Sequence, residues 1–412
     1  MLKKSEQTVI DDTHKYMEDN GLPTLKQHQR LPFLYWMPKK HKNPTGSRFI
    51  TSCTNTINSN LSQLVGNALS TMLKTVKNTS KYVHKYKSYK NYFIVDNRNE
   101  VLQYMKDHNH EERRYQKSVK SFDFSNLYTS IPLNKLITSV SKFINKVFLI
   151  KQKTFITLTN KNAYFANRRS KSTNSISLTS NELINHIEFI INNNMVIYKG
   201  KIYKQLIGIP MGTNCAPHLA NIFLHIYEEE FIESCVREGR IDVIEKLQGM
   251  FRYQDDCIVF NDEGIFELNM KDIYPPELSL NNTNTSADTC NYLDLTISVY
   301  RGNFNYRSYD KRRDYNFEIV NYPDLGGNIP FKPSYGVFTS QLVRFCHINK
   351  TVKYFTKDVK DLISKLYKQS YDLSFLKDKF VEFTKHKINV WSKYGIDISD
   401  NIFVKELFKL KS

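Results

Sequence analysis

The sequence predicts a mixed α+β fold, in which short apolar strands and amphipathic helices occupy different stretches of the chain. Two adjacent carboxylates, Asp255 and Asp256, stand between two short apolar arms that are predicted to pair as a hairpin. Apolar residues recur at helical spacing over residues 57–74 and again after Pro132. From Gln341 onward the pattern becomes helical and basic, which predicts a small helical lobe.

Length and charge limit the class of protein. A chain of 412 residues exceeds one compact core and predicts two or three lobes. The net charge of +18 favours a polyanionic partner, most simply nucleic acid, although a ribosomal or membrane-surface protein could carry the same charge. The six cysteines lack metal-ligand spacing, and we find neither a membrane-spanning run nor a signal peptide. These features predict an intracellular protein outside the membrane.

A basic hairpin is expected near the N-terminus. An apolar strand over residues 31–38 is followed by a basic segment that runs to Ile50 and contains a Pro-Thr-Gly-Ser turn. Lys42 and Arg48 flank this turn and form a cationic fork that suits a triphosphate, because arginine offers a planar donor pair and lysine a point charge. An ordinary solvated basic loop remains the alternative.

Three stretches give weaker signals. Residues 1 to about 30 are polar and show no clear period, and residues 151–178 are predicted to be a mobile basic insertion. Residues 81–90 interleave tyrosines with lysines, a composition that can grip a nucleic-acid strand. Because the whole chain is rich in lysine and tyrosine, we assign no site residue to this last stretch.

A third carboxylate is expected to approach the Asp255 hairpin. The strand over residues 118–124 is predicted to end at Asp123, and a helix is predicted to begin at Pro132. A carboxylate at the end of a core strand can face the hairpin across a sheet, and a two-metal site needs ligands from separate elements. Magnesium is the usual ion where the substrate is a nucleoside triphosphate. A solvated turn is the alternative explanation for the paired acids.

A glycine-containing loop precedes the hairpin. Thr179 and Glu182 predict a helix start with a capping box, and residues 195–203 predict another hairpin. The loop that follows contains Gln205, Gly208, Pro210 and Gly212, and it leads into a helix over residues 216–224. Glycines allow close backbone approach, so this loop could form the floor under a base pair, although ordinary loop chemistry explains it equally well.

The order of these motifs resembles a reverse transcriptase, and more closely the reverse transcriptases of Penelope-like elements, which are related to telomerase. The resemblance spans about residues 30–400. It is carried by residues 31–48, 122–132, 208–221, 253–256, 292–295 and 334–344. It implies a right-hand polymerase architecture, with an N-terminal extension and fingers over 1–115, a ferredoxin-like palm over 116–300 and a connector with a helical thumb over 301–412.

The resemblance also implies roles for individual residues. Asp123, Asp255 and the main-chain carbonyl of Phe124 would bind two Mg²⁺ ions, for which Mn²⁺ could substitute. Asp256 would complete the acidic site, and Tyr253 would support the hairpin.

The remaining implied roles concern the incoming nucleotide. Tyr128 would stack under its sugar and exclude a ribose 2′-hydroxyl. Lys42 and Arg48 would hold the triphosphate. Gln205, Gly208 and Pro210 would line the nascent pair.

The implied activity is RNA-directed DNA synthesis, in which a primer 3′-hydroxyl attacks the α-phosphate of a dNTP. The partners would be an RNA template and a DNA primer, and a chromosomal target would place the protein in the nucleus. The chain departs from the family pattern at several places. Residues 281–286 contain no lysine to act as leaving-group acid, for which Lys271 is a weak substitute. Residues 394–396 have no second half of a GIY-YIG nuclease signature, so we expect no such nuclease.

Two other functions stay open. An RNA-templated RNA polymerase is disfavoured by Gln254, which stands where such enzymes carry glycine, and by the bulk of Tyr128. A retroelement-derived nucleic-acid-binding protein without catalytic activity is disfavoured by the three intact acids.

Overall fold

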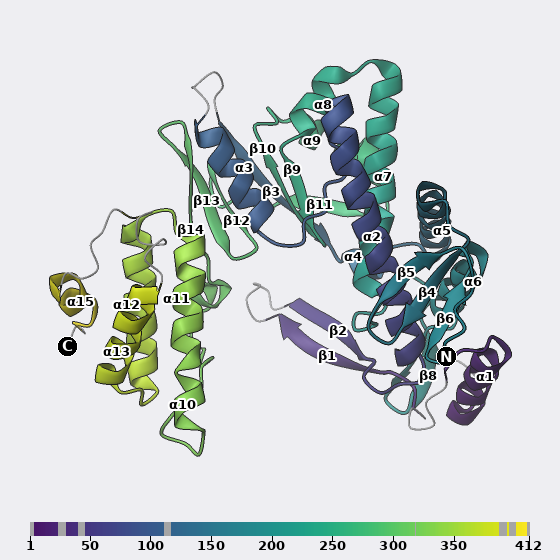
Figure 1. Ribbon diagram of the computed structural model, residues 1–412, viewed down its shortest axis with the longest axis horizontal. Helices are drawn as coiled ribbons and strands as arrows, with labels where there is room; N and C mark the ends of the chain where they lie inside the picture. Colours follow the sequence, from purple (N-terminus) through teal and green to yellow (C-terminus); the bar gives the residue numbers. More distant parts are fainter. Residues whose placement is uncertain are drawn as a thin grey trace. The chain divides into compact units, whose positions relative to one another are not determined.

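The chain divides into two compact units (Figure 1). The computed structural model describes residues 4–23, 30–39, 46–110, 117–317, 319–386, 394 and 401–409. Unit 1 comprises residues 1–100 and 122–282, and unit 2 comprises residues 101–121 and 283–412.

Unit 1 contains a four-stranded sheet with the order β11-β3-β10-β9. Its strands are β3 (Val119–Ser125, whose first three residues belong to unit 2), β9 (Met250–Tyr253), β10 (Asp256–Phe260) and β11 (Ser279–Asn282). Helices precede β9 and β11, which gives the strand–helix–strand–strand–helix–strand order of a split β-α-β motif. Residues on one face of the sheet, including Phe122, Phe124, Cys257 and Val259, join the largest hydrophobic core.

Long helices build the rest of that core. Helix α2 (Ser59–Lys87) packs against α5 (Leu133–Lys151), α6 (Ser180–Asn192) and α7 (Ala216–Glu238), and Figure 1 shows α2 beside α7. Helix α7 is buried on nearly all sides, as expected of a helix with apolar residues around its circumference. The predicted helix over 57–74 is confirmed but is longer than expected, because α2 also contains most of the tyrosine–lysine stretch.

A second sheet in unit 1 has the order β2-β1-β7-β8. The arms of the predicted basic hairpin form β1 (Phe33–Lys39) and β2 (Gly46–Ser52), which pair antiparallel. The predicted hairpin over 195–203 is also confirmed, as β7 (Met195–Tyr198) and β8 (Lys201–Lys204).

The N-terminal stretch, in which the sequence shows no clear period, contains a helix. Helix α1 (Glu6–Asp19) begins with Ser5 as its cap, whose hydroxyl accepts a hydrogen bond from the amide of Thr8. Val9 and Ile10 pack with Leu31 and Ile57 in a small core of their own. The apolar spacing of α1 is helical, but many polar residues separate its few buried positions.

The expected insertion at 151–178 is a three-stranded sheet, and this corrects the sequence prediction. Its order is β5-β4-β6, with β4 (Phe155–Thr159), β5 (Ala163–Ala166) and β6 (Ser175–Leu178). Ile156 and Leu158 enter the main core, while the hydroxyls of Thr157 and Ser177 lie 2.8 Å apart in a buried hydrogen bond. These strands are short, and the segments between them are polar and basic, so the stretch appears polar overall.

Unit 2 contains a three-stranded antiparallel sheet and a set of helices, in agreement with the predicted helical lobe. Most of α3 (Asn99–His110) belongs to this unit. The strands are β12 (Thr289–Tyr292), β13 (Leu295–Tyr300) and β14 (Asn303–Ser308), followed by the 3₁₀ turn η1 (Lys311–Asp314). The helices are α10 (Phe331–Ser334), α11 (Gly336–Ile348), α12 (Val352–Lys368), α13 (Leu373–His386) and α15 (Asn401–Leu407).

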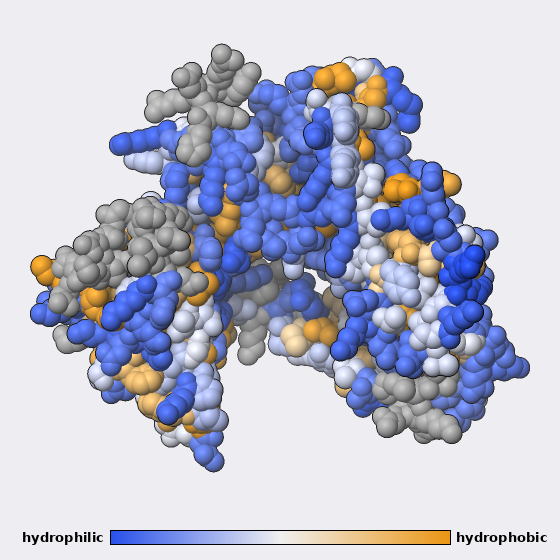
Figure 2. Space-filling view, in the orientation of Figure 1, coloured by the Kyte–Doolittle hydropathy of each residue, from blue (hydrophilic) through white to orange (hydrophobic). Residues whose placement is uncertain are grey.

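The surface in Figure 2 is mostly hydrophilic, with apolar residues scattered over it. Within the part of the chain that the structure describes, no helix is long and apolar enough to cross a bilayer.

Candidate active site

The predicted acidic hairpin is present at the end of the four-stranded sheet β11-β3-β10-β9 of unit 1. Tyr253, the last residue of β9, pairs with Asp256, the first residue of β10. Gln254 and Asp255 form the turn between them, and Gln254 adopts a left-handed backbone with φ of +54°. The two adjacent acids therefore differ in backbone position, one in the turn and one in the strand.

Asp123 lies on the strand next to this turn. The main-chain amide of Phe124 donates a hydrogen bond to the main-chain carbonyl of Asp255, with 3.1 Å between nitrogen and oxygen. Because side chains alternate along a strand, Asp123 lies on the face opposite the buried rings of Phe122 and Phe124. All three acids are half-buried. The structure thus brings the strand of Asp123 next to the hairpin that carries Asp255 and Asp256, although Asp123 and Asp255 are 132 positions apart in the chain.

The chemistry of these donors fits magnesium. Mg²⁺ is a hard cation that is usually bound by one or two carboxylates, with substrate phosphates and water completing the octahedron. Asp123 and Asp255 supply carboxylates of that kind from two elements. Among the described residues, no group of three or more His, Cys, Asp or Glu side chains forms a ready-made metal cage.

Tyr128 connects the segment after β3 to the turn. Asn126 adopts a left-handed backbone and starts the one-turn helix α4 (Leu127–Ser130). The hydroxyl of Tyr128 donates a hydrogen bond to the side-chain oxygen of Gln254 over 3.0 Å. Burial and, to a smaller degree, the negative charge of Asp255 raise the pKa of Tyr128 to about 12, so its hydroxyl remains protonated at neutral pH.

The glycine loop is joined by its backbone to the same segment. The amides of Gly208 and Ile209 donate to the carbonyls of Ile131 and Tyr128 over 2.9 and 2.6 Å. Gly208 has φ of +81°, and a Cβ there would lie 2.4 Å from the carbonyl oxygen of Tyr128. Packing of backbone on backbone therefore explains this glycine, and its predicted contact with the nascent pair stays a prediction.

Gly212 has a similar explanation on the other side of the loop. Its φ is +124°, and a Cβ would lie 2.0 Å from the carbonyl oxygen of Thr51 in β2. The neighbouring carbonyl of Met211 accepts a hydrogen bond from the amide of Thr51 over 2.9 Å. The loop thus joins the segment that contains Tyr128 to the β1–β2 hairpin.

Gln205 and Pro210 line one cavity of about 330 Å³, together with Thr129 and residues of β1, β2, β7 and β8. The side-chain amide of Gln205 donates to the carbonyl of Ile207 over 2.9 Å, which stabilises the start of the loop. Gly208 lines a much smaller neighbouring cavity instead. The structure therefore brings two of the three predicted lining residues to a shared space of ligand size.

For the remaining predicted residues that the structure describes, no contact with the acids or with the glycine loop establishes their roles. Arg48 is exposed on β2, opposite Met37 of β1, and Lys42 lies outside the described residues. Tyr253 is 37% exposed, and its supporting role stays a prediction.

The stretch in which the family carries a leaving-group lysine begins at Asn281 of β11. Asn281 pairs in register with Asp123 and donates its side-chain amide to the Ser125 hydroxyl over 2.5 Å. Lys271, the weak candidate for a leaving-group acid, is exposed in the last turn of α9 (Ile265–Ile273).

A buried polar network under the turn was missed by the sequence analysis. Arg252 is fully buried, and its Nε and Nη2 atoms donate to the Glu228 carboxylate over 2.5 and 3.2 Å. Nη1 donates to the side-chain oxygen of Asn221 over 2.8 Å and to the main-chain carbonyl of Gln254 over 3.1 Å. The hydroxyl of Tyr274 donates to Glu228 over 2.9 Å. This network fixes the turn to α7.

The charges of the network compensate each other. Burial alone would lower the pKa of Arg252, but the Glu228 carboxylate raises it above the usual value. The sequence signals that could have indicated this network are an arginine within an apolar strand and Asn221 among the apolar residues of the first half of α7.

Lys90 reinforces the other end of β9. Its ammonium group donates to the carbonyl of Met250 over 2.6 Å and lies 3.8 Å from the ring centre of Phe251. Loss of water around the amino group lowers the pKa of Lys90 to about 7.

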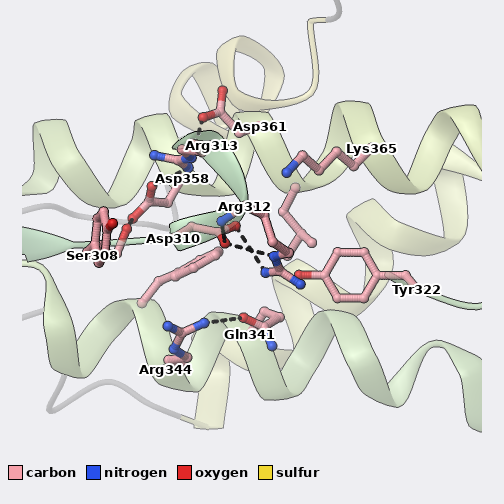
Figure 3. A pocket seen from close by; sticks show the side chains of 13 residues that line it. Ser308, Asp310, Arg312, Arg313, Tyr322, Gln341, Arg344, Asp358, Asp361 and Lys365 are labelled. Atoms are coloured by element: carbon pink, nitrogen blue, oxygen red, sulfur yellow. Dashed lines mark hydrogen bonds and ion pairs between the residues drawn. The ribbon is translucent and has the colours of Figure 1, made fainter. Parts of the chain in front are cut away.

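A second cluster of charges lies in unit 2 (Figure 3). Arg312 pairs with Asp310, Arg313 with Asp358 and Asp361, and Arg344 with Asp294. The cavity between them measures about 20 Å³, room for a single water molecule. Because carboxylates already pair with these arginines, we assign no ligand to the cluster and attribute it to the packing of β14, η1, α11 and α12.

Two short helices connect the strands of the sheet β11-β3-β10-β9: α8 (Ile241–Leu247) leads into β9, and α9 follows β10.

Comparisons with known proteins identify the fold. No protein-family model matches the sequence, and no curated protein matches it. A structure of telomerase from Candida albicans, in complex with a TWJ fragment of telomeric RNA, is similar with a TM-score of 0.51 and 12% identity. The similarity covers 98% of this chain and 62% of that chain.

Two structures of telomerase from Candida tropicalis score slightly lower. The apo structure has a TM-score of 0.49 at 14% identity, and covers 98% of this chain and 65% of that chain. The structure with a TWJ fragment of telomeric RNA has a TM-score of 0.47 at 12% identity, and covers 91% of this chain and 57% of that chain. The chain therefore spans less than two thirds of the length of these proteins. At 12% identity, the likeness to the C. albicans structure concerns the fold alone. This chain has a mixed α/β fold similar to that of a telomerase.

Proposed function

We propose that this chain is a nucleic-acid polymerase, and more narrowly an RNA-directed DNA polymerase that extends a primer 3′-hydroxyl with dNTPs. The observation that carries the proposal is the hydrogen bond that joins the strand of Asp123 to the turn of Asp255, donated by the main-chain amide of Phe124 to the main-chain carbonyl of Asp255. The fold similarity to a telomerase supports the general class. The motif resemblance to Penelope-like reverse transcriptases supports the narrower activity and a retroelement origin.

In this proposal, the palm and fingers of a right-hand polymerase correspond to elements of unit 1, and the thumb corresponds to elements of unit 2. The sheet β11-β3-β10-β9, with its split β-α-β order, would be the ferredoxin-like palm. The β1–β2 hairpin would belong to the fingers, and the helices of unit 2 would form the thumb.

Asp123 and Asp255 would hold two Mg²⁺ ions, or Mn²⁺ in their place, with Asp256 adding negative charge and the carbonyl of Phe124 a further oxygen. Bound magnesium would lower the pKa of the primer hydroxyl and neutralise negative charge on the pyrophosphate. The protein's own residues bind and align the reactants, so no covalent side-chain nucleophile is needed.

The nucleotide would be positioned by the residues around the turn and the loop. Tyr128 would lie against the sugar, and Gln205 and Pro210 would border the nascent pair from their shared cavity. Arg48, with Lys42, would bind the triphosphate. The net charge of +18 supports an RNA template and a DNA primer as partners. A chromosomal target would place the protein in the nucleus.

Primer extension tests this proposal. The purified chain is incubated with a DNA primer on an RNA template, dNTPs and Mg²⁺, and we expect extension that EDTA abolishes. Asp255→Asn and Asp123→Asn should each abolish extension, because an amide is a poor magnesium ligand. Asp272→Asn, which makes the same change at an exposed carboxylate of α9, should extend normally. Extension by Asp255→Asn at the wild-type rate would refute the metal assignment.

The same assay separates the two other functions. Incorporation of rNTPs in preference to dNTPs would indicate an RNA-templated RNA polymerase. Binding of the primed template without extension under any metal would indicate a nucleic-acid-binding protein without catalytic activity.

A further inference from the structure

We propose that Gln254 is a positioning residue for sugar discrimination: its side-chain amide fixes the ring of Tyr128 against the sugar of the incoming nucleotide. This inference rests on the proposed polymerase function. The contact that carries it is the 3.0 Å hydrogen bond from the Tyr128 hydroxyl to the Gln254 side-chain oxygen.

The backbone of Gln254 is a rigid base for this contact. Its carbonyl accepts a hydrogen bond from Arg252, whose guanidinium is fully buried and fixed by Glu228 and Asn221. A left-handed backbone costs a non-glycine residue about 1 kcal/mol, so backbone preference alone does not favour glutamine here. The hydrogen bond to Tyr128 supplies a reason for a long amide side chain at this position.

The backbone of Tyr128 is fixed as well. Its carbonyl accepts a hydrogen bond from the amide of Ile209, and Gly208 packs directly against the same carbonyl. The remaining freedom of Tyr128 is rotation of its side chain, which is only half-buried. The Gln254 amide holds the polar end of that side chain and so limits this rotation.

The consequence concerns the space beside Asp255. A ring held in one orientation excludes the extra oxygen of a ribose at that place, whereas a ring that can swing aside admits it. Loss of the hydrogen bond should therefore weaken sugar discrimination while the ring itself is retained. Loss of the ring should weaken it further.

The test measures the ratio of kcat/KM for a dNTP to kcat/KM for the matching rNTP on one primed RNA template. Tyr128→Phe and Gln254→Met remove the same hydrogen bond from opposite ends, and each should lower the ratio about fivefold, the effect of one net hydrogen bond. The double variant should show no further loss, because the bond can be lost only once.

Three more variants complete the test. Gln254→Glu keeps an acceptor oxygen and should therefore keep the wild-type ratio, even if kcat changes. Tyr128→Ala should lower the ratio more than Tyr128→Phe. Tyr164→Phe, which removes an exposed hydroxyl on β5, should leave both rate and ratio unchanged.

The outcomes separate this inference from the proposed function. A wild-type ratio in both Tyr128→Phe and Gln254→Met would overturn the inference, while extension by the wild-type chain would leave the proposed function intact. Additive losses in the double variant would also overturn it, because the two side chains would then act independently. A wild-type chain that extends no primer would overturn both. Two single variants that remove the bond from either end keep the test decisive if one of them folds poorly.

Discussion

The guanidinium of Arg252 and the carboxylate of Glu228 form an ion pair whose side chains are 0% and 1% exposed. The pair connects β9 to α7, and Arg252 also reaches the carbonyl of Gln254 in the turn. Desolvation makes such a pair costly to form, but once it is formed the loss of either partner leaves an uncompensated buried charge.

Single substitutions in this pair should be strongly destabilising. Arg252→Met and Glu228→Gln should each lower the free energy of unfolding by about 3–5 kcal/mol. The double variant Arg252→Met/Glu228→Met should recover much of that loss, because no charge then remains buried. Urea unfolding followed by circular dichroism measures these differences. Single variants within about 1 kcal/mol of the wild type would contradict the buried ion pair.

The glycines of the loop should be irreplaceable for a steric reason. Gly208→Ala would place a Cβ 2.4 Å from the Tyr128 carbonyl oxygen, whereas Gly200→Ala has no atom within 4 Å. Both glycines have positive φ, at +81° and +70°, so backbone strain is similar in the two variants. We expect Gly208→Ala to lose about 1–3 kcal/mol more unfolding free energy than Gly200→Ala. Equal losses in thermal unfolding would mean that the loop relaxes without cost.

Lys90 should make stability depend on pH. Its pKa is about 7 in the folded protein and 10.5 in the reference state, so between these values the unfolded chain binds a proton that the folded chain lacks. Stability should therefore rise as pH increases from 7 to 9, by up to about 1.4 kcal/mol per pH unit. Lys90→Met should remove this rise, whereas the exposed Lys171→Met should keep it. A rise of the same slope in Lys90→Met would assign it to another group.

The ion-pair cluster of unit 2 should depend on Asp358 more than on Asp361. Asp358 is buried in α12, where it accepts hydrogen bonds from Ser308, Asn349 and Arg313. Asp358→Ala removes the buried acceptor that these three donors share and should lower the unfolding free energy by about 2–4 kcal/mol. Asp361 pairs with the same Arg313 at the surface, and Asp361→Ala should cost less than about 1 kcal/mol. Comparable losses would contradict the burial of Asp358.

Elements that depend on residues close in sequence could be predicted. The capping box of Thr179 and Glu182 starts α6, and the strands on either side of Asp255 form a hairpin. The helix after Pro132 begins at Leu133. Turn chemistry and apolar spacing within a few residues determine each of these features.

Elements whose burial depends on distant partners could not be predicted in the same way. Thr157 is fully buried in β4 because Ser177 of β6 satisfies its hydroxyl, yet an isolated Thr-rich segment appears solvent-exposed. Arg252 likewise depends on Glu228 and Asn221, which come from a helix more than twenty residues earlier. The approach of Asp123 to Asp255 was predicted from the kinds of elements that carry them, whereas the network that fixes the turn required the fold.

Unit 2 is built from two segments that are far apart in the chain, residues 101–121 and 283–412, and this affects how it folds during synthesis. Its first segment leaves the ribosome long before its second, because all of residues 122–282 must be translated in between. At about 5–20 residues per second this delay is on the order of ten seconds, during which the early segment lacks its partners from residues 283–412. Assembly of this lobe during translation must therefore await its C-terminal half, and neither segment expressed alone should reach the native state.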